Sequence, residues 1–265
     1  MSGDLYRRPE LYEWAFSHRD IATEVDALIR WYGRHCALRP LPNVLELGAG
    51  PAEHAIEMAR RGIEATALDG AATMRAFAAR RARRAGVALT VTGGDLRGFD
   101  LRRRFDLAFC VGDSTAHVHD LDGLVSHFES VGRHLRRGGL HVMETAHPAD
   151  FMGPVARTKR SWHVTRDGRR LKVRWGGPTD RFDPLTQLEH STVTLTIGSG
   201  NGGAPTVVRD QLVLRRWTPD EIDAAARASS ALTVVATYGG YDDEPLASPT
   251  ASRLIVCLIS TARRR

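Results

Sequence analysis

Short apolar runs alternate with longer amphipathic stretches between residues 43 and 144. The short runs have the length of buried strands, and the longer stretches carry apolar residues at helical spacing and end at glycine. The predicted strands cover residues 44–47, 64–68, 88–92, 105–111 and 140–144, and the predicted helices cover about residues 52–61, 72–85 and 121–136. Arg137-Gly138-Gly139 is expected to end the last helix. This alternation predicts a mainly parallel sheet with helices on its faces.

The pattern changes to hairpins between Arg160 and Trp217. Two extended runs, 161–166 and 169–175, flank Asp167-Gly168, a dipeptide that favours a tight hairpin turn. Two further runs, 187–197 and 206–216, flank a glycine-rich loop, and residues 192–197 alternate polar and apolar side chains as a half-buried strand does. An antiparallel sheet is therefore predicted as an insertion.

The main sheet is expected to resume after this insertion. Thr218-Pro219-Asp220-Glu221 is a capping box with proline at the first helical position, so it opens a helix that runs to about Ala228. Two last strands are predicted over residues 232–237 and 253–259, and the sheet finishes antiparallel. The fold class is α/β, with residues 1–154 and 217–265 as one domain and residues 155–216 as the inserted antiparallel β subdomain.

Composition agrees with one large soluble domain that carries an insertion. The chain has 265 residues, of which 42% are hydrophobic and 26% charged, as in ordinary globular proteins. It contains neither an apolar run long enough to span a bilayer nor a signal peptide, so we expect a cytoplasmic protein without membrane contact. The cysteines Cys36, Cys110 and Cys257 are widely spaced and odd in number, which predicts reduced, buried thiols.

The basic balance of the chain raises the question of a nucleic-acid partner. The formal net charge is +6, and all but two of the 37 basic residues are arginines. These arginines are scattered over a predicted helix, a loop and the tail, whereas a nucleic-acid footprint clusters on one face with aromatic residues between the charges. The distribution favours a solvated surface over nucleic-acid binding.

Candidate chemistry gathers where the predicted parallel strands end, because open α/β sheets bind ligands outside the carboxyl ends of their strands. The strand ends carry Glu46-Leu47-Gly48-Ala49-Gly50, Asp69-Gly70, Gly94-Asp95-Leu96 and Val111-Gly112-Asp113-Ser114. Gly48 and Gly50 allow a turn tight enough for a ligand to approach the backbone. These ends define the predicted site.

The residues around the first turn disfavour a phosphate ligand. A dinucleotide fingerprint needs a small residue three positions after its second glycine, where this chain has Glu53. A pyrophosphate would be repelled by that carboxylate, whereas Glu46 before the turn suits a cationic ligand.

Two further strand ends suit a nucleoside. Asp69, 19 residues after Gly50, is placed to accept hydrogen bonds from two ribose hydroxyls. Asp95 can accept a hydrogen bond from an exocyclic adenine amine, and the Leu96 amide can donate one to the ring. A nucleoside with a positive charge and without phosphate fits this set of residues.

These strand-end residues, together with Arg137-Gly138-Gly139, resemble the ordered motifs of the class I S-adenosylmethionine-dependent methyltransferases. The resemblance implies a Rossmann-like, seven-stranded, mostly parallel sheet, S-adenosyl-L-methionine as the cofactor and S-adenosyl-L-homocysteine as its product. The cofactor-binding residues that we expect are Arg19, Glu46, Gly48, Ala49, Gly50, Asp69, Gly70, Asp95, Leu96 and Val111. Arg19 would pair with the methionine carboxylate, as an N-terminal arginine does in related enzymes.

The N-terminal segment Tyr12-Glu13-Trp14-Ala15-Phe16 and the inserted sheet further resemble the small-molecule methyltransferases typified by glycine and sugar-amine N-methyltransferases. In those enzymes a Tyr-Asp segment closes over the cofactor, and here Glu13 replaces the aspartate. The insertion is expected to form one wall of the acceptor pocket or a homodimer contact.

Candidate bases follow the fourth predicted strand: Asp113, His117 and His119. Because an unperturbed imidazole is largely neutral at pH 7, His117 can accept a proton there. The resemblance implies that His117 acts with Tyr12 on the acceptor proton. Asp113 stands where sugar-amine N-methyltransferases carry a serine, so it is either the base or an anchor for an acceptor ammonium. A metal site formed by these histidines and His147 is disfavoured, because no carboxylate-histidine ligand pattern accompanies them.

The sequence therefore predicts a methyltransferase enzyme (EC 2.1.1 class) that acts on a small molecule, with N-methylation of an amine-bearing metabolite or natural-product intermediate favoured. The alternatives are C- or O-methylation of a natural product, an RNA or protein methyltransferase, and a protein that binds the cofactor without turnover. The identity of the acceptor is not predicted.

Overall fold

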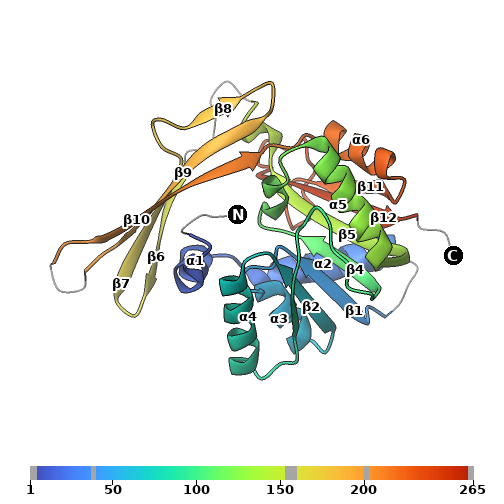
Figure 1. Ribbon diagram of the computed structural model, residues 1–265, viewed down its shortest axis with the longest axis horizontal. Helices are drawn as coiled ribbons and strands as arrows, with labels where there is room; N and C mark the ends of the chain where they lie inside the picture. Colours follow the sequence, from blue (N-terminus) through green and yellow to red (C-terminus); the bar gives the residue numbers. More distant parts are fainter. Residues whose placement is uncertain (1–4, 37–39, 153–159, 200–202, 262–265) are drawn as a thin grey trace.

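Two β-sheets, both drawn in Figure 1, organise the computed structural model, which describes residues 5–36, 40–152, 160–199 and 203–261. The main sheet has seven strands in the order β11-β12-β5-β4-β1-β2-β3. The strands are β1 (Asn43–Leu47), β2 (Glu64–Asp69), β3 (Thr90–Gly93), β4 (Phe105–Cys110), β5 (Leu135–Ala146), β11 (Leu232–Tyr238) and β12 (Arg253–Ser260). β12 pairs antiparallel with both of its neighbours, so it runs against the other strands. The predicted fold class is confirmed.

Helices cover both faces of the main sheet. They are α1 (Pro9–Phe16), α2 (Ile21–His35), α3 (Glu53–Arg60), α4 (Ala72–Arg84), α5 (Leu121–His134) and α6 (Pro219–Ser229), with short 3-10 turns η1 (Ser114–His117) and η2 (Pro148–Asp150). β1 shows why two layers form: Val44 is buried with residues of α2 and α3, whereas Leu45 is buried with residues of α5 and α6. Successive strand side chains point to opposite faces, so each face has its own apolar core.

The second sheet is antiparallel and extends away from the main sheet (Figure 1). Its strands are β6 (Arg160–Arg166), β7 (Arg169–Trp175), β8 (Arg181–Asp183), β9 (Leu188–Ile197) and β10 (Thr206–Arg215), in the order β10-β9-β7-β6 with β8 beside β9. Asp167 and Gly168 form the β6–β7 turn with φ values of 50° and 71°, as a tight hairpin turn requires. The inner face of this sheet packs on Leu5, Trp14 and Ala15, so the second sheet and α1 share a core.

Several boundaries differ from the sequence predictions. α5 ends at His134 and β5 begins at Leu135, so Arg137-Gly138-Gly139 lies inside a strand and does not end the helix. The pairing of β5 with β4 shifts register there, and Gly138 takes a φ of 73°, which glycine adopts at little cost. Helices α1 and α2 and strand β8 were not predicted. The predicted boundary between residues 154 and 155 falls outside the described residues.

The three cysteines are buried free thiols, and burial raises the pKa of each. Among the described residues, no helix is both long and apolar enough to cross a membrane.

Candidate functional site

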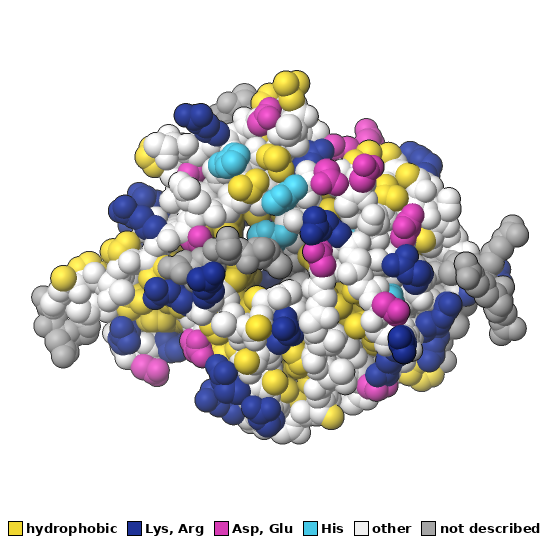
Figure 2. All heavy atoms as spheres, in the orientation of Figure 1, with side chains coloured by type: hydrophobic (Ala, Val, Ile, Leu, Met, Phe, Trp, Pro, Cys, Tyr) yellow, Lys and Arg dark blue, Asp and Glu magenta, His cyan; other side chains and the backbone are white. Residues whose placement is uncertain are grey.

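A cavity of about 300 Å³ lies between the carboxyl edge of the main sheet, helix α1 and the second sheet. The face in Figure 2 is hollowed near its centre, with histidine side chains at the rim. The N-terminal segment contributes Tyr6, Tyr12, Phe16, His18 and Arg19 to the lining. The main sheet with its loops and helices contributes Gly48, Gly50, Asp69, Ala71, Met74, Leu96, Gly112, Asp113, Ser114, His117, Glu144, Thr145, Ala146, Asp150, Ser252 and Arg253. The second sheet and the residue after β10 contribute Arg160, Trp162, Trp175, Leu214 and Arg216.

The turn after β1 is held open toward the cavity by Asp69. The two carboxylate oxygens of Asp69 accept hydrogen bonds from the backbone N–H groups of Gly50 and Ala71, each at 2.7 Å. Burial raises the pKa of Asp69 although both bonds oppose the shift. Gly48 has a φ of 64°, and a Cβ there would lie 2.8 Å from the Cβ of Ser114. Only glycine fits at this point, which leaves backbone accessible to a ligand.

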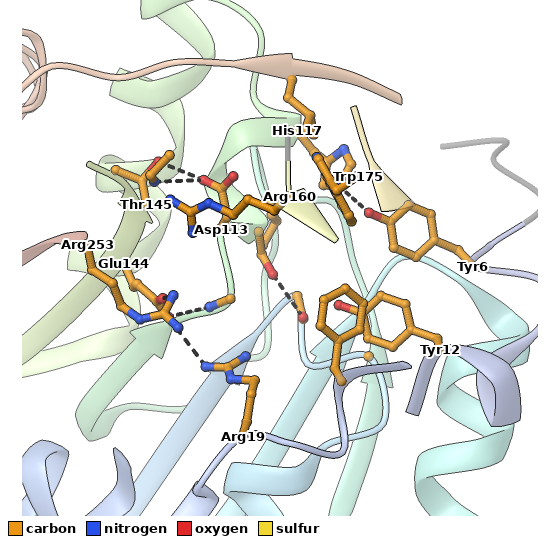
Figure 3. A pocket seen from close by; sticks show the side chains of 18 of the residues that line it. Tyr6, Tyr12, Arg19, Asp113, His117, Glu144, Thr145, Arg160, Trp175 and Arg253 are labelled. Carbon is orange, nitrogen blue, oxygen red and sulfur yellow. Dashed lines mark hydrogen bonds and ion pairs between the residues drawn. The ribbon is translucent and has the colours of Figure 1, made fainter. Parts of the chain in front are cut away.

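A cluster of charges lies at one end of the cavity. Glu144 is buried and accepts hydrogen bonds from the Gly112 backbone N–H at 2.6 Å and from Arg253. The Arg19 guanidinium lies 3.5 Å from Glu144 and pairs more closely with Glu24 at 2.5 Å. Burial alone would raise the pKa of Glu144, but Arg253 and Arg19 lower it to about 2, so the carboxylate is ionised. Figure 3 shows this cluster apart from His117 and Tyr6.

His117 faces the opposite end of the cavity and is hydrogen-bonded to Tyr6. The Tyr6 hydroxyl lies 2.7 Å from Nε2 of His117, as drawn in Figure 3. Burial lowers the pKa of His117 to about 4, so the imidazole is neutral at pH 7. Tyr12 also lines the cavity, and its ring stands 5.8 Å from that of Tyr6. The hydroxyl that contacts His117 therefore belongs to Tyr6, whereas the resemblance implied Tyr12.

Asp113 is fixed from two sides. Its Oδ1 accepts a hydrogen bond from the Thr145 hydroxyl at 2.8 Å, and its Oδ2 accepts one from Arg216 at 2.7 Å. Arg216 follows β10, is 4% exposed, and donates through Nε to Glu189 at 2.7 Å. Asp113 thus joins the carboxyl edge of the main sheet to the second sheet, and it shares the single positive charge of Arg216 with Glu189.

Aromatic side chains form the wall between α1 and the second sheet. The Phe16 ring lies 5.7 Å from Trp162 and 6.3 Å from Trp175. The Trp162 indole N–H donates to the Ala15 carbonyl at 2.8 Å, which ties β6 to α1. Since both tryptophans line the cavity, the insertion forms one of its walls.

The structure brings eight of the predicted site residues to the cavity and leaves five outside its lining. The lining includes Tyr12, Arg19, Gly48, Gly50, Asp69, Leu96, Asp113 and His117. The residues outside it are Glu46, Ala49, Gly70, Asp95 and Val111.

The hydrogen bonds of Glu46 and Asp95 contradict the ligand contacts that the sequence predicted for them. Glu46 is 3% exposed, and its carboxylate accepts hydrogen bonds from the backbone N–H of Ala55 at 2.9 Å and from His54, both in α3, so it faces the helix and not a cationic ligand. Asp95 is paired with the Arg97 guanidinium at 2.8 Å and points to solvent.

The three other excluded residues flank the lining. Ala49 and Val111 are buried in the core on α2 and α3, and the Ala49 N–H is used by a backbone hydrogen bond to Leu68. Gly70 is exposed beside Asp69. Each is a neighbour in sequence of a residue that lines the cavity.

Other lining residues were missed by sequence reasoning. They include Tyr6, Phe16, Glu144, Thr145, Trp162, Trp175, Arg216 and Arg253. Glu144 had a usable signal, since it lies near the end of the fifth predicted strand. The tryptophans and Arg216 had none, because the packing of the insertion against the main sheet is not encoded in any local pattern.

The remaining candidate histidines bind backbone carbonyls. Nε2 of His119 lies 3.0 Å from the Val213 oxygen, and Nε2 of His147 lies 3.1 Å from the Leu246 oxygen. Within the described ranges, no group of three or more metal-ligating side chains is present.

Comparison with known proteins finds a methyltransferase domain in part of the chain and the same fold in solved structures. Residues 44–139 match the family model described as a methyltransferase domain. No curated protein matches the chain in sequence. Similar solved structures include an S-adenosylmethionine-dependent methyltransferase from Clostridium acetobutylicum, with 16% identity, a TM-score of 0.76, and coverage of 94% of this chain and 96% of that one.

Two other similar structures are those of a sugar N-methyltransferase and an amino pentose methyltransferase. The sugar N-methyltransferase KedS8 from a Streptoalloteichus species has 19% identity, a TM-score of 0.74, and coverage of 100% of this chain and 95% of that one. CalS10, an amino pentose methyltransferase from Micromonospora echinaspora solved with S-adenosylmethionine bound, has 20% identity, a TM-score of 0.71, and coverage of 94% and 96%. At such identities the likeness shows the fold. The domain match shows a methyltransferase domain over residues 44–139, in agreement with the predicted class, and the solved structures show a fold shared with S-adenosylmethionine-dependent methyltransferases.

Proposed function

We propose that the enzyme transfers the methyl group of S-adenosylmethionine to the nitrogen of a small amine acceptor. The cofactor would lie at the β1 and β2 ends of the cavity, and the acceptor would lie between His117 and the aromatic wall. The observation that carries the proposal is the pair His117 and Tyr6, which places a neutral imidazole in the cavity that also borders the turn at Gly48 and Gly50.

The residues of the first end fit a phosphate-free nucleoside cofactor. Gly48 and Gly50 place no side chain of their own on the turn. Each carboxylate oxygen of Asp69 beside it accepts one backbone hydrogen bond, which leaves lone pairs for ribose hydroxyls. Arg19 would pair with the methionine carboxylate, and Leu96 would contact the adenine. Bound S-adenosylmethionine supplies an electrophilic methyl group on a sulfonium.

The second end has groups for binding and deprotonating an ammonium. Trp162 and Trp175 offer π faces to a cation, and Asp113 offers a negative charge. An amine attacks only with a free lone pair, so one proton must leave the ammonium first. The Tyr6 hydroxyl can donate its own proton to Nε2 of His117. In the same step its oxygen can take up the proton that leaves the acceptor ammonium. Asp113 is already bound by Arg216 and Thr145, which suits an anchor better than a base.

The test is methyl transfer from labelled S-adenosylmethionine to a panel of small amines, phenols, carbon acids, RNA and protein. We expect amines to be labelled, and we expect turnover to fall by up to about 100-fold in His117→Ala and by less in Tyr6→Phe. His119→Ala is the matched control, because His119 lies on the same loop and contacts the Val213 carbonyl instead.

Each other outcome identifies a rival. Labelled phenols or carbon acids would indicate O- or C-methylation, and labelled RNA or protein with binding that weakens steeply with salt would indicate a macromolecular acceptor. Cofactor binding without transfer to any acceptor would favour a binding protein. An inactive Asp113→Asn variant beside an active His117→Ala variant would assign the base to Asp113.

A homodimer contact through the second sheet and a cytoplasmic location remain part of the proposal, to be tested by sedimentation and fractionation.

A further inference from the structure

His54 is a buried histidine between two carboxylates, behind the cavity. It lies in α3 and is 3% exposed. Its Nε2 is 2.7 Å from a carboxylate oxygen of Glu24 in α2, and its Nδ1 is 3.2 Å from a carboxylate oxygen of Glu46 in β1. The imidazole therefore joins two helices and a strand in a place without solvent.

Both ring nitrogens face acceptors, and this arrangement requires the imidazolium. A neutral ring carries one N–H, so one of its nitrogens would present a lone pair to a carboxylate oxygen. Burial lowers the pKa of His54, but the hydrogen bonds to Glu24 and Glu46 outweigh burial and raise it to about 9. His54 is thus a fixed positive charge at neutral pH.

The pairing continues from Glu24 to the cavity. Glu24 accepts two hydrogen bonds from Arg19, from Nε at 3.0 Å and from Nη2 at 2.5 Å. This two-pronged pairing fixes the plane of the guanidinium. Arg19 reaches the cavity beside Gly112. The two are so close that a Cβ at position 112 would lie 2.9 Å from Nη1 of Arg19. One oxygen of Glu24 binds both Arg19 and His54, so the two cations share one carboxylate.

We propose that His54 is a positioning residue that holds Glu24, and through it Arg19, in the orientation that binds the carboxylate of the methionine part of the cofactor. This inference rests on the proposed function, since it takes the cavity as the site of S-adenosylmethionine. Without His54, Glu24 would lose a buried cationic partner and would be free to turn toward solvent. Arg19 would then be free to turn toward Glu144, which lies 3.5 Å from its guanidinium.

The experiment compares two ligands that differ in the group that Arg19 would bind. S-adenosylhomocysteine carries the amino acid carboxylate, and 5′-methylthioadenosine lacks it. Calorimetry of His54→Asn should show S-adenosylhomocysteine affinity reduced by about tenfold, the loss of one buried hydrogen bond to a charged group, with 5′-methylthioadenosine affinity within about twofold of the parent. His134→Asn is the matched control, because His134 is equally buried but lies on α5 outside the cavity lining. It should change neither affinity.

The outcomes separate this inference from the proposed function. A parent protein that binds neither ligand overturns the proposed function and the inference with it. A parent that binds both, with a His54→Asn variant that loses both equally or neither, overturns the inference alone. If His54→Asn fails to fold, Glu24→Gln replaces it, with the same selective loss expected. Nitrogen NMR of the parent at pH 7 should show both ring nitrogens of His54 protonated, and a neutral ring would contradict the arrangement.

Discussion

Two buried histidines should make the protein sensitive to mild acid. His127 in α5 and His141 in β5 are both fully buried, with ring centroids 5.5 Å apart. Nδ1 of His127 donates to the Leu96 carbonyl at 2.7 Å, and Nδ1 of His141 donates to the Ala108 carbonyl at 3.2 Å. Within the described residues, Nε2 of each ring has no hydrogen-bond partner. Burial lowers the pKa of His127 to about 4 and that of His141 to about 3.

The magnitude follows from the difference between the folded and unfolded pKa values. In the unfolded chain a histidine takes up a proton as the pH falls below about 6.5, whereas these folded histidines stay neutral until about pH 4. The unfolded state therefore binds more protons at pH 5. The stability that each histidine contributes is present above pH 6.5 and is lost as the pH falls, by about 2 kcal/mol per residue between pH 7 and pH 5.

The assay is urea unfolding of the parent and of His127→Leu at pH 7 and at pH 5. The variant loses the hydrogen bond to Leu96, so it should be less stable than the parent at pH 7. Between pH 7 and pH 5 it should lose about 2 kcal/mol less than the parent, because leucine does not titrate. His163→Gln, at an exposed position in β6, is the control and should follow the parent. Equal losses in the parent and His127→Leu would refute the reasoning.

Three further substitutions test the cavity. Asp69→Asn weakens the hydrogen bond from Gly50 and one ribose contact, so calorimetry should show about tenfold weaker cofactor binding, and unchanged binding by a folded variant would remove Asp69 from the site. Gly48→Ala places a Cβ against Ser114 at a φ of 64°, so thermal unfolding should show a loss of at least about 1 kcal/mol, and an unchanged melting temperature would show that the turn relaxes freely. Trp175→Ala should raise the acceptor KM several-fold and leave cofactor affinity within about twofold, whereas weaker cofactor binding would place Trp175 at the cofactor.

The sequence predicted the part of the site that lies on the first turn and at the carboxyl ends of the parallel strands. Gly48, Asp69 and His117 could be chosen because parallel strands bring their carboxyl ends to one edge whatever their separation in sequence. Glu46 shows the limit of that rule. It lies in the same motif, but its side chain leaves β1 on the face that α3 covers, and the sequence does not state which of two alternating faces a ligand occupies.

The contacts across the second sheet could not be predicted. Arg216 reaches Asp113 because the insertion folds back onto the loop after β4, and this packing depends on the core shared by α1 and the second sheet. Tyr6 reaches His117 for the same reason: Leu5, next to it, is buried in that core. No periodicity in residues 5–16 indicates which of two tyrosines turns toward the histidine.

The reversed direction of β12 decides which end of the chain can carry an attached group without disturbing the cavity. Its first residue, Arg253, lines the cavity, so its last residue, Ser260, leaves the sheet at the opposite edge. Figure 1 shows β12 far from the second sheet and α1 beside it. Leu5 is buried, and its backbone N–H donates to Asp210 at 2.9 Å. A purification tag, fusion partner or surface linkage is therefore expected to spare activity when it follows Ser260 in the chain and to impair it when it immediately precedes Leu5.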